Sequence, residues 1–180
     1  GERMERTRGA GAPAHLEAPP PGIFGGLHGE SCLADSRLPF DEDRRGGTTT
    51  RRPPKSPNGI IPTLLGFFRQ GRPGLWVAWS KQETREPVDF DSRVAVDERK
   101  YPKLNAERIA LTPNDVNLFY EVFSKEALWP IIFLFPERAH FEAQHWEHYL
   151  EINRIFAERT AEVAEQDAIV WVHDYNLWMV

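Results

Sequence analysis

Residues 168–172 form an unbroken apolar run, rich in β-branched and aromatic side chains, that leads directly into His173, Asp174 and Tyr175. Such a run is typical of a strand that is buried inside a parallel sheet. In open α/β sheets, ligands bind beside the loops that follow the carboxyl ends of the strands. The run therefore predicts an interior strand, and the Asp174 carboxylate after it either caps the loop or accepts hydrogen bonds from ligand hydroxyls.

The sequence before this strand alternates between strand and helix patterns. Strand patterns occupy residues 74–80, 93–97 and 108–112. A helix is expected from Thr112 to about Phe123, because threonine caps helices and the proline that follows it suits a first helical position. Apolar residues recur at roughly helical spacing over 140–166. This order predicts an α/β fold with a Rossmann-like sheet.

Composition divides the chain into three parts. Residues 1–30 are rich in Gly, Pro, Ala and charge, and lack apolar periodicity, so we expect a disordered tail. Residues 31–180 are expected to form a Rossmann-like domain, in which the Gly-, Pro- and charge-rich segment 41–57 is a flexible loop; the family resemblance described below implies that this domain is partial and N-terminal. The segment from residue 58 onward has the composition of a folded protein.

Charge and hydropathy argue against several classes of protein. The net charge is −5, with acidic and basic residues mixed along the chain, so no nucleic-acid partner is expected. No apolar run is long enough to span a membrane, and the first residues lack the apolar core of a signal peptide. The single cysteine, Cys32, cannot form an internal disulfide. We expect a cytoplasmic protein with no membrane partner.

Three histidines and the cysteine are the first candidates for chemistry. His145 and His148 could share a helix face with His140 nearby, but their spacing is not that of a zinc protease and a fourth ligand is lacking, so no metal site is predicted. Cys32 has no histidine paired with it in the sequence. The chain also lacks the glycine-rich loops that hold dinucleotides or triphosphates, so no cofactor is expected.

Four segments in order resemble one enzyme family. The segments "FYEVFSKEALWP" (119–130) and "WVHDYNL" (171–177) resemble segments of trehalose-6-phosphate synthases, and "GLWVAWS" (74–80) and "NRIFAERTAEV" (153–163) resemble two others. The chain thus resembles glycosyltransferase family 20. The resemblance implies a retaining glycosyltransferase of GT-B architecture, in which two Rossmann-like domains face each other across a cleft.

Two further segments resemble one branch of that family. "SPNGIIPTLLGFF" (56–68) and "LWPIIFLFPE" (128–137) are most similar to glucosylglycerol-phosphate synthases. This implies transfer of glucose from ADP-glucose to glycerol 3-phosphate in the synthesis of a compatible solute for osmoprotection. Family members are much longer, so the chain is expected to be an N-terminal fragment that holds the acceptor side and is inactive alone.

The resemblance also implies roles for particular residues. Arg37 and Tyr120 would bind the acceptor phosphate, Trp129 would wall the acceptor pocket, and Asp174 would accept hydrogen bonds from acceptor hydroxyls. Gly59 would let backbone N–H groups approach the donor diphosphate. Retaining transfer in this family uses the donor's leaving phosphate to help deprotonate the acceptor, so no residue is assigned as catalytic.

Two other functions stay open on the sequence. One is trehalose-6-phosphate synthesis, with a nucleotide-glucose donor and glucose 6-phosphate as acceptor, although the "NGIIP" loop argues against it. The other is a non-catalytic domain that binds a sugar phosphate. A homo-oligomer is compatible with the sequence.

Overall fold

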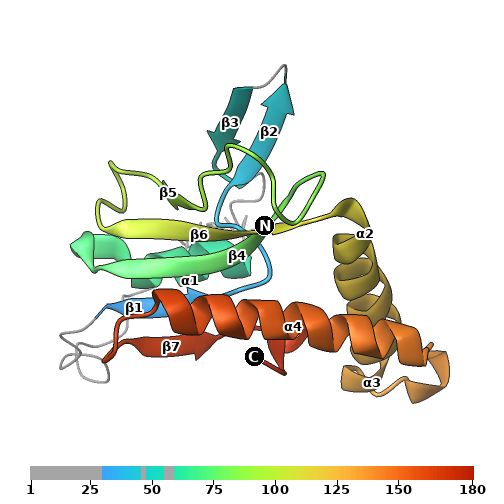
Figure 1. Ribbon diagram of the computed structural model, residues 1–180. Coiled ribbons are helices and arrows are strands. Elements are labelled where there is room, and N and C mark those ends of the chain that lie inside the picture. The colour runs from blue at the N-terminus through green and yellow to red at the C-terminus, as the bar shows by residue number, and fades with distance from the viewer. Residues whose placement is uncertain (1–29, 46–47, 55–58) are drawn as a thin grey trace, which may run out of the picture.

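A five-stranded sheet forms the centre of the computed structural model, which describes residues 30–45, 48–54 and 59–180 (Figure 1). Its strands lie in the order β5 (Arg93–Ala95), β6 (Leu104–Leu111), β4 (Gly74–Lys81), β1 (Ser31–Ala34) and β7 (Ile169–Val172). Strands β6, β4, β1 and β7 are parallel, and β5 is antiparallel to β6. The predicted α/β fold with a Rossmann-like sheet is confirmed.

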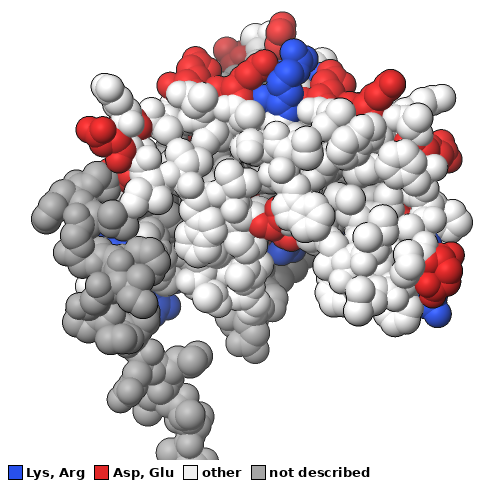
Figure 2. Space-filling view, turned by 90° about the horizontal axis from the view of Figure 1, so that it is seen from below, with Lys and Arg blue, Asp and Glu red and all other residues white. Residues whose placement is uncertain are grey.

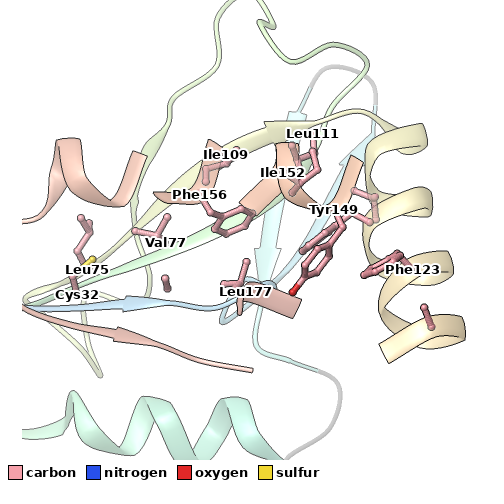
Figure 3. Packing of buried hydrophobic residues seen from close by; sticks show 14 residues of the cluster. Cys32, Leu75, Val77, Ile109, Leu111, Phe123, Tyr149, Ile152, Phe156 and Leu177 are labelled. Carbon is pink, nitrogen blue, oxygen red and sulfur yellow. The ribbon is translucent and has the colours of Figure 1, made fainter. Parts of the chain in front are cut away.

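Helices cover both faces of this sheet (Figure 1). Helix α1 (Ile60–Phe67) packs on one face, where it shares an apolar cluster with Leu33 of β1 and Trp76 of β4. Helix α4 (Ala143–Val163) crosses the other face. Figure 3 shows three apolar side chains of α4, Tyr149, Ile152 and Phe156, packed among side chains of the strands and of the helical segment that follows β6.

The helical segment that follows β6 begins as predicted and continues further. Helix α2 (Pro113–Val116) is capped by Thr112, whose hydroxyl accepts the Asp115 N–H while the Asp115 carboxylate accepts the Thr112 N–H. The chain continues as a π-helix, η2 (Asn117–Leu128), and then as α3 (Trp129–Ile132). Three 3₁₀ turns complete the helical elements of the described part: η1 (Arg69–Gly71), η3 (Pro136–Arg138) and η4 (Tyr175–Leu177).

The segment 41–57 differs from its prediction as a flexible loop. It contains a two-stranded antiparallel hairpin, β2 (Asp41–Arg45) and β3 (Thr48–Arg52), which extends beyond the sheet (Figure 1). Opposite charges on the two strands explain why a charged sequence pairs here, because Arg51 lies 3.5 Å from Glu42 and Arg52 lies 3.7 Å from Asp43. The threonines of β3 add β-branched side chains, which favour strands.

Strand β7 also differs from its prediction as an interior strand. It pairs with β1 alone, lies at the edge of the described sheet, and leaves its four residues exposed. Figure 2 shows few charged side chains at the centre of the surface on this side of the molecule. The apolar composition of β7 was the basis of the prediction, but burial also requires a neighbour on each side.

The predicted tail 1–30 lies almost wholly outside the residues that the structure describes. Only its last residue, Glu30, is described, so the disorder of the tail stays a prediction. Among the residues that the structure describes, no helix is both long and apolar enough to cross a membrane.

Candidate functional site

The carboxyl ends of β1, β4 and β7 meet at one edge of the sheet, where the predicted ligand site lies. Arg37 is in the loop after β1, and Asp174 is in the loop after β7. Because β1 lies between β4 and β7, these loops are close in space although they are far apart in the sequence. The structure therefore brings the first and last predicted site residues to the same edge.

Arg37 and Gly59 line one cavity of about 1140 Å³. The Arg37 side chain is exposed, and its backbone is fixed on both sides: its N–H donates to Asp35 at 2.8 Å, and its carbonyl accepts the Trp76 indole N–H at 3.0 Å. Gly59 is the N-cap of α1 and has φ +131°, a conformation that other residues rarely adopt. An exposed arginine and an exposed helix N-terminus thus line the same cavity, and both are groups that favour an anion.

Trp79, at the carboxyl end of β4, lines this cavity and was missed as a site residue by the sequence analysis. Its indole nitrogen is buried and has no hydrogen-bond partner among the described residues. A buried donor of this kind is costly unless something accepts from it. The signal in the sequence was the second tryptophan of "GLWVAWS", which alternation alone did not separate from a core residue.

The β2–β3 hairpin forms another wall of the cavity, and Glu42 anchors it to the sheet. The Glu42 carboxylate accepts Arg108 at 2.6 Å and the Ser80 hydroxyl at 2.7 Å. Arg108 is buried, donates to the Asp91 carbonyl, and lies 4.6 Å over the Phe90 ring. This ionic network holds the hairpin in place beside Arg37.

Asp174 does not line the cavity of Arg37. It has φ +76° and borders a separate hollow of about 460 Å³ together with Tyr175 and Trp178. Its carboxylate accepts the Tyr175 N–H at 2.7 Å and the Asn176 side-chain amide at 3.1 Å. Both readings of Asp174 from the sequence therefore remain: the carboxylate caps the loop, and it stays exposed for further hydrogen bonds.

Tyr120 and Trp129 approach the same edge from η2 and α3. The Tyr120 ring lies 6.4 Å from the Trp79 ring, and the Lys125 ammonium lies 4.7 Å over it. Trp129 is 47% exposed, although a tryptophan in such a segment is usually a core residue. Its ring centroid lies 5.7 Å from that of Tyr175. The structure places Tyr120 near the Arg37 cavity and Trp129 near the Asp174 hollow.

Tyr175 lies among the predicted acceptor residues and was also missed. Burial raises the pKa of its hydroxyl to about 12, with the charge of Asp174 and the nearby Tyr120 adding to the rise and Arg37 opposing it. Arg37, Tyr120 and Asp174 are thus all within electrostatic reach of one phenol. Its signal was its place directly after Asp174 in "WVHDYNL", where only the aspartate was assigned a role.

His148 and the buried Cys32 have structural surroundings, whereas His140 is exposed. His148 Nε2 lies 3.3 Å from an Asp115 oxygen, and the same carboxylate is held by two nitrogens of Arg85. No group of three potential ligands that could hold a metal ion occurs among the described residues, and the absence of a metal stays a prediction. Burial raises the pKa of the Cys32 thiol to about 11, with Glu30 adding to the rise, so this thiol is a poor nucleophile.

The chain is similar to known proteins over most of its length. The model of glycosyltransferase family 20 matches residues 30–180. The chain is 53% identical over 145 residues to a glucosylglycerol-phosphate synthase of Pseudomonas anguilliseptica, covering 80% of the chain and 19% of that protein. It is 35% identical over 149 residues to a trehalose-6-phosphate synthase of Mycobacterium sp. (strain JLS), covering 81% of the chain and 28% of that protein.

Solved structures show the same fold. A trehalose-6-phosphate synthase from Burkholderia multivorans superposes with a TM-score of 0.63 at 23% identity, over 83% of this chain and 29% of that one. The enzyme from E. coli, bound with UDP-2-fluoro glucose, superposes with a TM-score of 0.60 at 23% identity, over 82% of this chain and 28% of that one. The described sheet and helices are therefore part of the GT-B fold of these synthases.

Proposed function

The chain belongs to glycosyltransferase family 20, and we propose that the whole protein is a retaining glucosyltransferase that moves glucose from ADP-glucose to glycerol 3-phosphate. Its product would be glucosylglycerol phosphate, a precursor of a compatible solute. The chain spans between 19% and 28% of the length of the relatives named above. We infer that it supplies the acceptor side of the site and is inactive alone.

The degree of identity within the family is the observation that carries this assignment. Identity to the glucosylglycerol-phosphate synthase of P. anguilliseptica is 53%, and to that of Synechocystis sp. it is 41%. Identity to the trehalose-6-phosphate synthase of Mycobacterium sp. (strain JLS) is 35%. Both kinds of relative align over about four fifths of the chain, so the difference lies in sequence and not in coverage.

The acceptor would bind at the edge where the loops after β1 and β7 meet. Arg37, exposed at the cavity, would grip the phosphate with charge-assisted hydrogen bonds, and Tyr120 would donate its phenolic hydrogen to it. Asp174 would accept hydrogen bonds from acceptor hydroxyls, and Trp129 would form an apolar wall beside them. Tyr175, within electrostatic reach of Arg37, Tyr120 and Asp174, marks the centre of this acceptor site.

The donor would bind beside Gly59. The positive φ of this residue leaves the first turn of α1 open to a diphosphate, whose charge the helix N-terminus favours. In retaining transfer of this type the leaving phosphate helps to deprotonate the acceptor hydroxyl on the same face of the sugar. No enzyme nucleophile is then needed, and the site residues bind and orient.

An assay of the whole protein tests the choice of acceptor. ADP-glucose is offered with glycerol 3-phosphate or with glucose 6-phosphate, and the transferred glucose is measured. We expect turnover with glycerol 3-phosphate. Turnover with glucose 6-phosphate alone would assign the protein to trehalose-6-phosphate synthesis, and binding of either phosphate without any transfer would indicate a non-catalytic domain.

The variant Asp174→Ala tests the acceptor site itself. A hydrogen bond to a charged group is worth about 1.5 to 3 kcal/mol, so kcat/KM for glycerol 3-phosphate should fall by about ten- to a hundredfold in the whole protein. Asp167→Ala is the matched control, because Asp167 is an exposed aspartate near the other end of the same strand. Unchanged acceptor kinetics in Asp174→Ala, with loss of stability, would make this carboxylate a loop cap only.

A further inference from the structure

Asp35 is a buried carboxylate in the loop after β1, and both of its oxygens are used. Its Oδ1 accepts the Arg37 N–H at 2.8 Å, and its Oδ2 lies 2.7 Å from Nδ1 of His173, in the loop after β7. Its own N–H donates to the Val77 carbonyl of β4 at 3.0 Å, so the backbone that carries the carboxylate is fixed to the sheet. One side chain therefore joins the two loops that carry Arg37 and Asp174.

His173 is held as firmly as Asp35. Its N–H donates to the Ala34 carbonyl at 2.8 Å, which continues the pairing of β1 and β7 by one residue. The next residue is Asp174, whose positive φ turns the chain sharply away from the strand. A second link between the loops lies close by, where the Asn176 amide is 3.5 Å from the Ser36 hydroxyl and also donates to Asp174.

We propose that Asp35 is a positioning residue for the acceptor, which acts through His173 and through the Arg37 backbone. By fixing both loops, it sets the separation between the cation that binds the phosphate and the carboxylate that binds the hydroxyls. That separation selects how far the reacting hydroxyl lies from the phosphate of the acceptor. The inference rests on the proposed function of Arg37 and Asp174 and adds a residue that touches neither substrate.

The charges around His173 support this role. The hydrogen bond to the Asp35 carboxylate raises the pKa of His173, and burial opposes the rise. The charges of Asp35 and Asp174 add to the rise, and the charge of Arg37 opposes it. The Trp171 ring meets the His173 ring edge-on, with centroids 6.2 Å apart. Protonation of His173 thus strengthens the link between the loops, and Asp35 keeps that proton on the ring to higher pH.

The test compares Asp35→Asn with Asp97→Asn in the whole protein, with the KM of each substrate and kcat measured separately. Asparagine keeps an oxygen for the Arg37 N–H but removes the charge that faces His173. We expect the KM for glycerol 3-phosphate to rise by about three- to tenfold, with the KM for ADP-glucose and kcat within about twofold. The control residue Asp97 also accepts two backbone N–H groups, but it lies in the loop between β5 and β6, away from the proposed acceptor site. The kinetic constants of Asp97→Asn should therefore match those of wild type.

The pH profile separates positioning from general stability. In Asp35→Asn, the alkaline fall of kcat/KM for the acceptor should begin at a lower pH than in Asp97→Asn. Ionisation of the acceptor phosphate affects both variants equally, so it does not cause this difference. His173→Asn keeps a donor near the Nδ1 position but cannot titrate, so the part of the fall due to His173 should be absent. The double variant Asp35→Asn/His173→Asn should be no worse than the more damaging single variant.

The outcomes distinguish this inference from the proposed function. If Asp174→Ala impairs acceptor kinetics but Asp35→Asn and His173→Asn leave the acceptor KM and the pH profile unchanged, Asp35 has no positioning role. If Asp35→Asn does not fold, His173→Asn decides the question by its pH profile. Where wild type uses glucose 6-phosphate, the same comparison is made with that acceptor, and a wild type without any transfer overturns both proposals.

Discussion

Trp76 and Trp171 occupy equivalent places on the two strands that flank β1, yet only one of them is buried. Both are paired with Leu33 in the parallel register, so the three side chains point to the same face of the sheet. Trp76 is 0% exposed, whereas Trp171 is 44% exposed. Beyond β4 lies β6, and beyond β7 the described part of the chain has no further strand.

The pair shows which part of burial a strand sequence determines and which part its neighbours determine. Trp76 packs against Phe68, with ring centroids 6.5 Å apart, and donates its indole N–H to the Arg37 carbonyl. Trp171 meets the edge of the Phe67 ring, at the end of α1, with ring centroids 6.2 Å apart. Aromatic and β-branched composition made both strands predictable, and their position in the sheet made them different.

The largest expected effect is the loss of Trp76. In the 180-residue chain, Trp76→Ala should lower the free energy of unfolding by about 3–5 kcal/mol, because it opens a cavity and leaves the Arg37 carbonyl without its donor. Trp171→Ala should cost roughly 1–2 kcal/mol, because nearly half of this side chain is already in contact with water. Urea unfolding followed by circular dichroism measures both values. Equal losses would contradict the comparison.

The same two variants in the whole protein sharpen the comparison. If further polypeptide covers β7 there, Trp171→Ala should cost more than in the 180-residue chain, while the cost of Trp76→Ala should stay the same. An unchanged cost for Trp171→Ala would show that β7 is also an edge strand in the whole protein.

The next largest effect on stability is expected at Gly74, the first residue of β4. Ser31 of β1 is paired with Gly74 of β4 on one side and with Ile169 of β7 on the other. A Cβ atom at Gly74 would lie 2.2 Å from the buried Phe68 ring, so Gly74→Ala should destabilise the chain by about 1–3 kcal/mol. Gly66→Ala, in α1 with open space around it, is the matched control and should be neutral or stabilising by up to about 1 kcal/mol. Similar losses in both variants would remove packing as the cause.

Much of the fold follows from local patterns in the sequence. The strand pattern at 74–80 lies within β4, and the pattern at 108–112 covers the last four residues of β6 but runs one residue beyond its end. The capping residues Thr112 and Pro113 mark the start of a helix as predicted. The hairpin at 41–52 was not predictable in this way, because its strands are stabilised by cross-strand charges and by the contact of Glu42 with distant Arg108. Strand β1 was not predicted, because only four of its residues enter the sheet and their burial comes from β4 and β7.

The site was predictable at the level of position and family, but less so at the level of contacts. The rule that ligands bind at the carboxyl ends of strands placed Asp174 correctly at that edge, and the family resemblance supplied Arg37, Tyr120 and Trp129. Pairs that are far apart in sequence, such as Asp35 with His173, leave no local pattern. The roles of all these residues in binding stay predictions.

The smallest expected effects are differences in how stability depends on pH at the two sides of the sheet. Glu107 of β6 is buried, which opposes its ionisation, but hydrogen bonds from Arg159 and Arg93 outweigh burial and hold its pKa below the usual value. A carboxyl group of this kind stabilises the fold above its unfolded pKa of about 4.3, and the contribution is lost as the pH falls through the folded pKa. At the end of β7 the sign is reversed: the pKa of His173 is raised by Asp35, so its contribution is complete below about pH 6.5 and is lost as the pH rises through the folded pKa.

Urea midpoints measured from about pH 3 to pH 9 in the 180-residue chain should therefore respond to two variants in opposite ranges. Glu107→Gln should flatten the decline of stability on the acidic side, because glutamine keeps the size of the side chain but binds no proton. His173→Asn should flatten the decline above neutral pH and leave the acidic side as in wild type. A change in the same pH range for both variants would show that these groups are coupled across the sheet, whereas two independent changes would confirm that β6 and β7 are stabilised by separate charges.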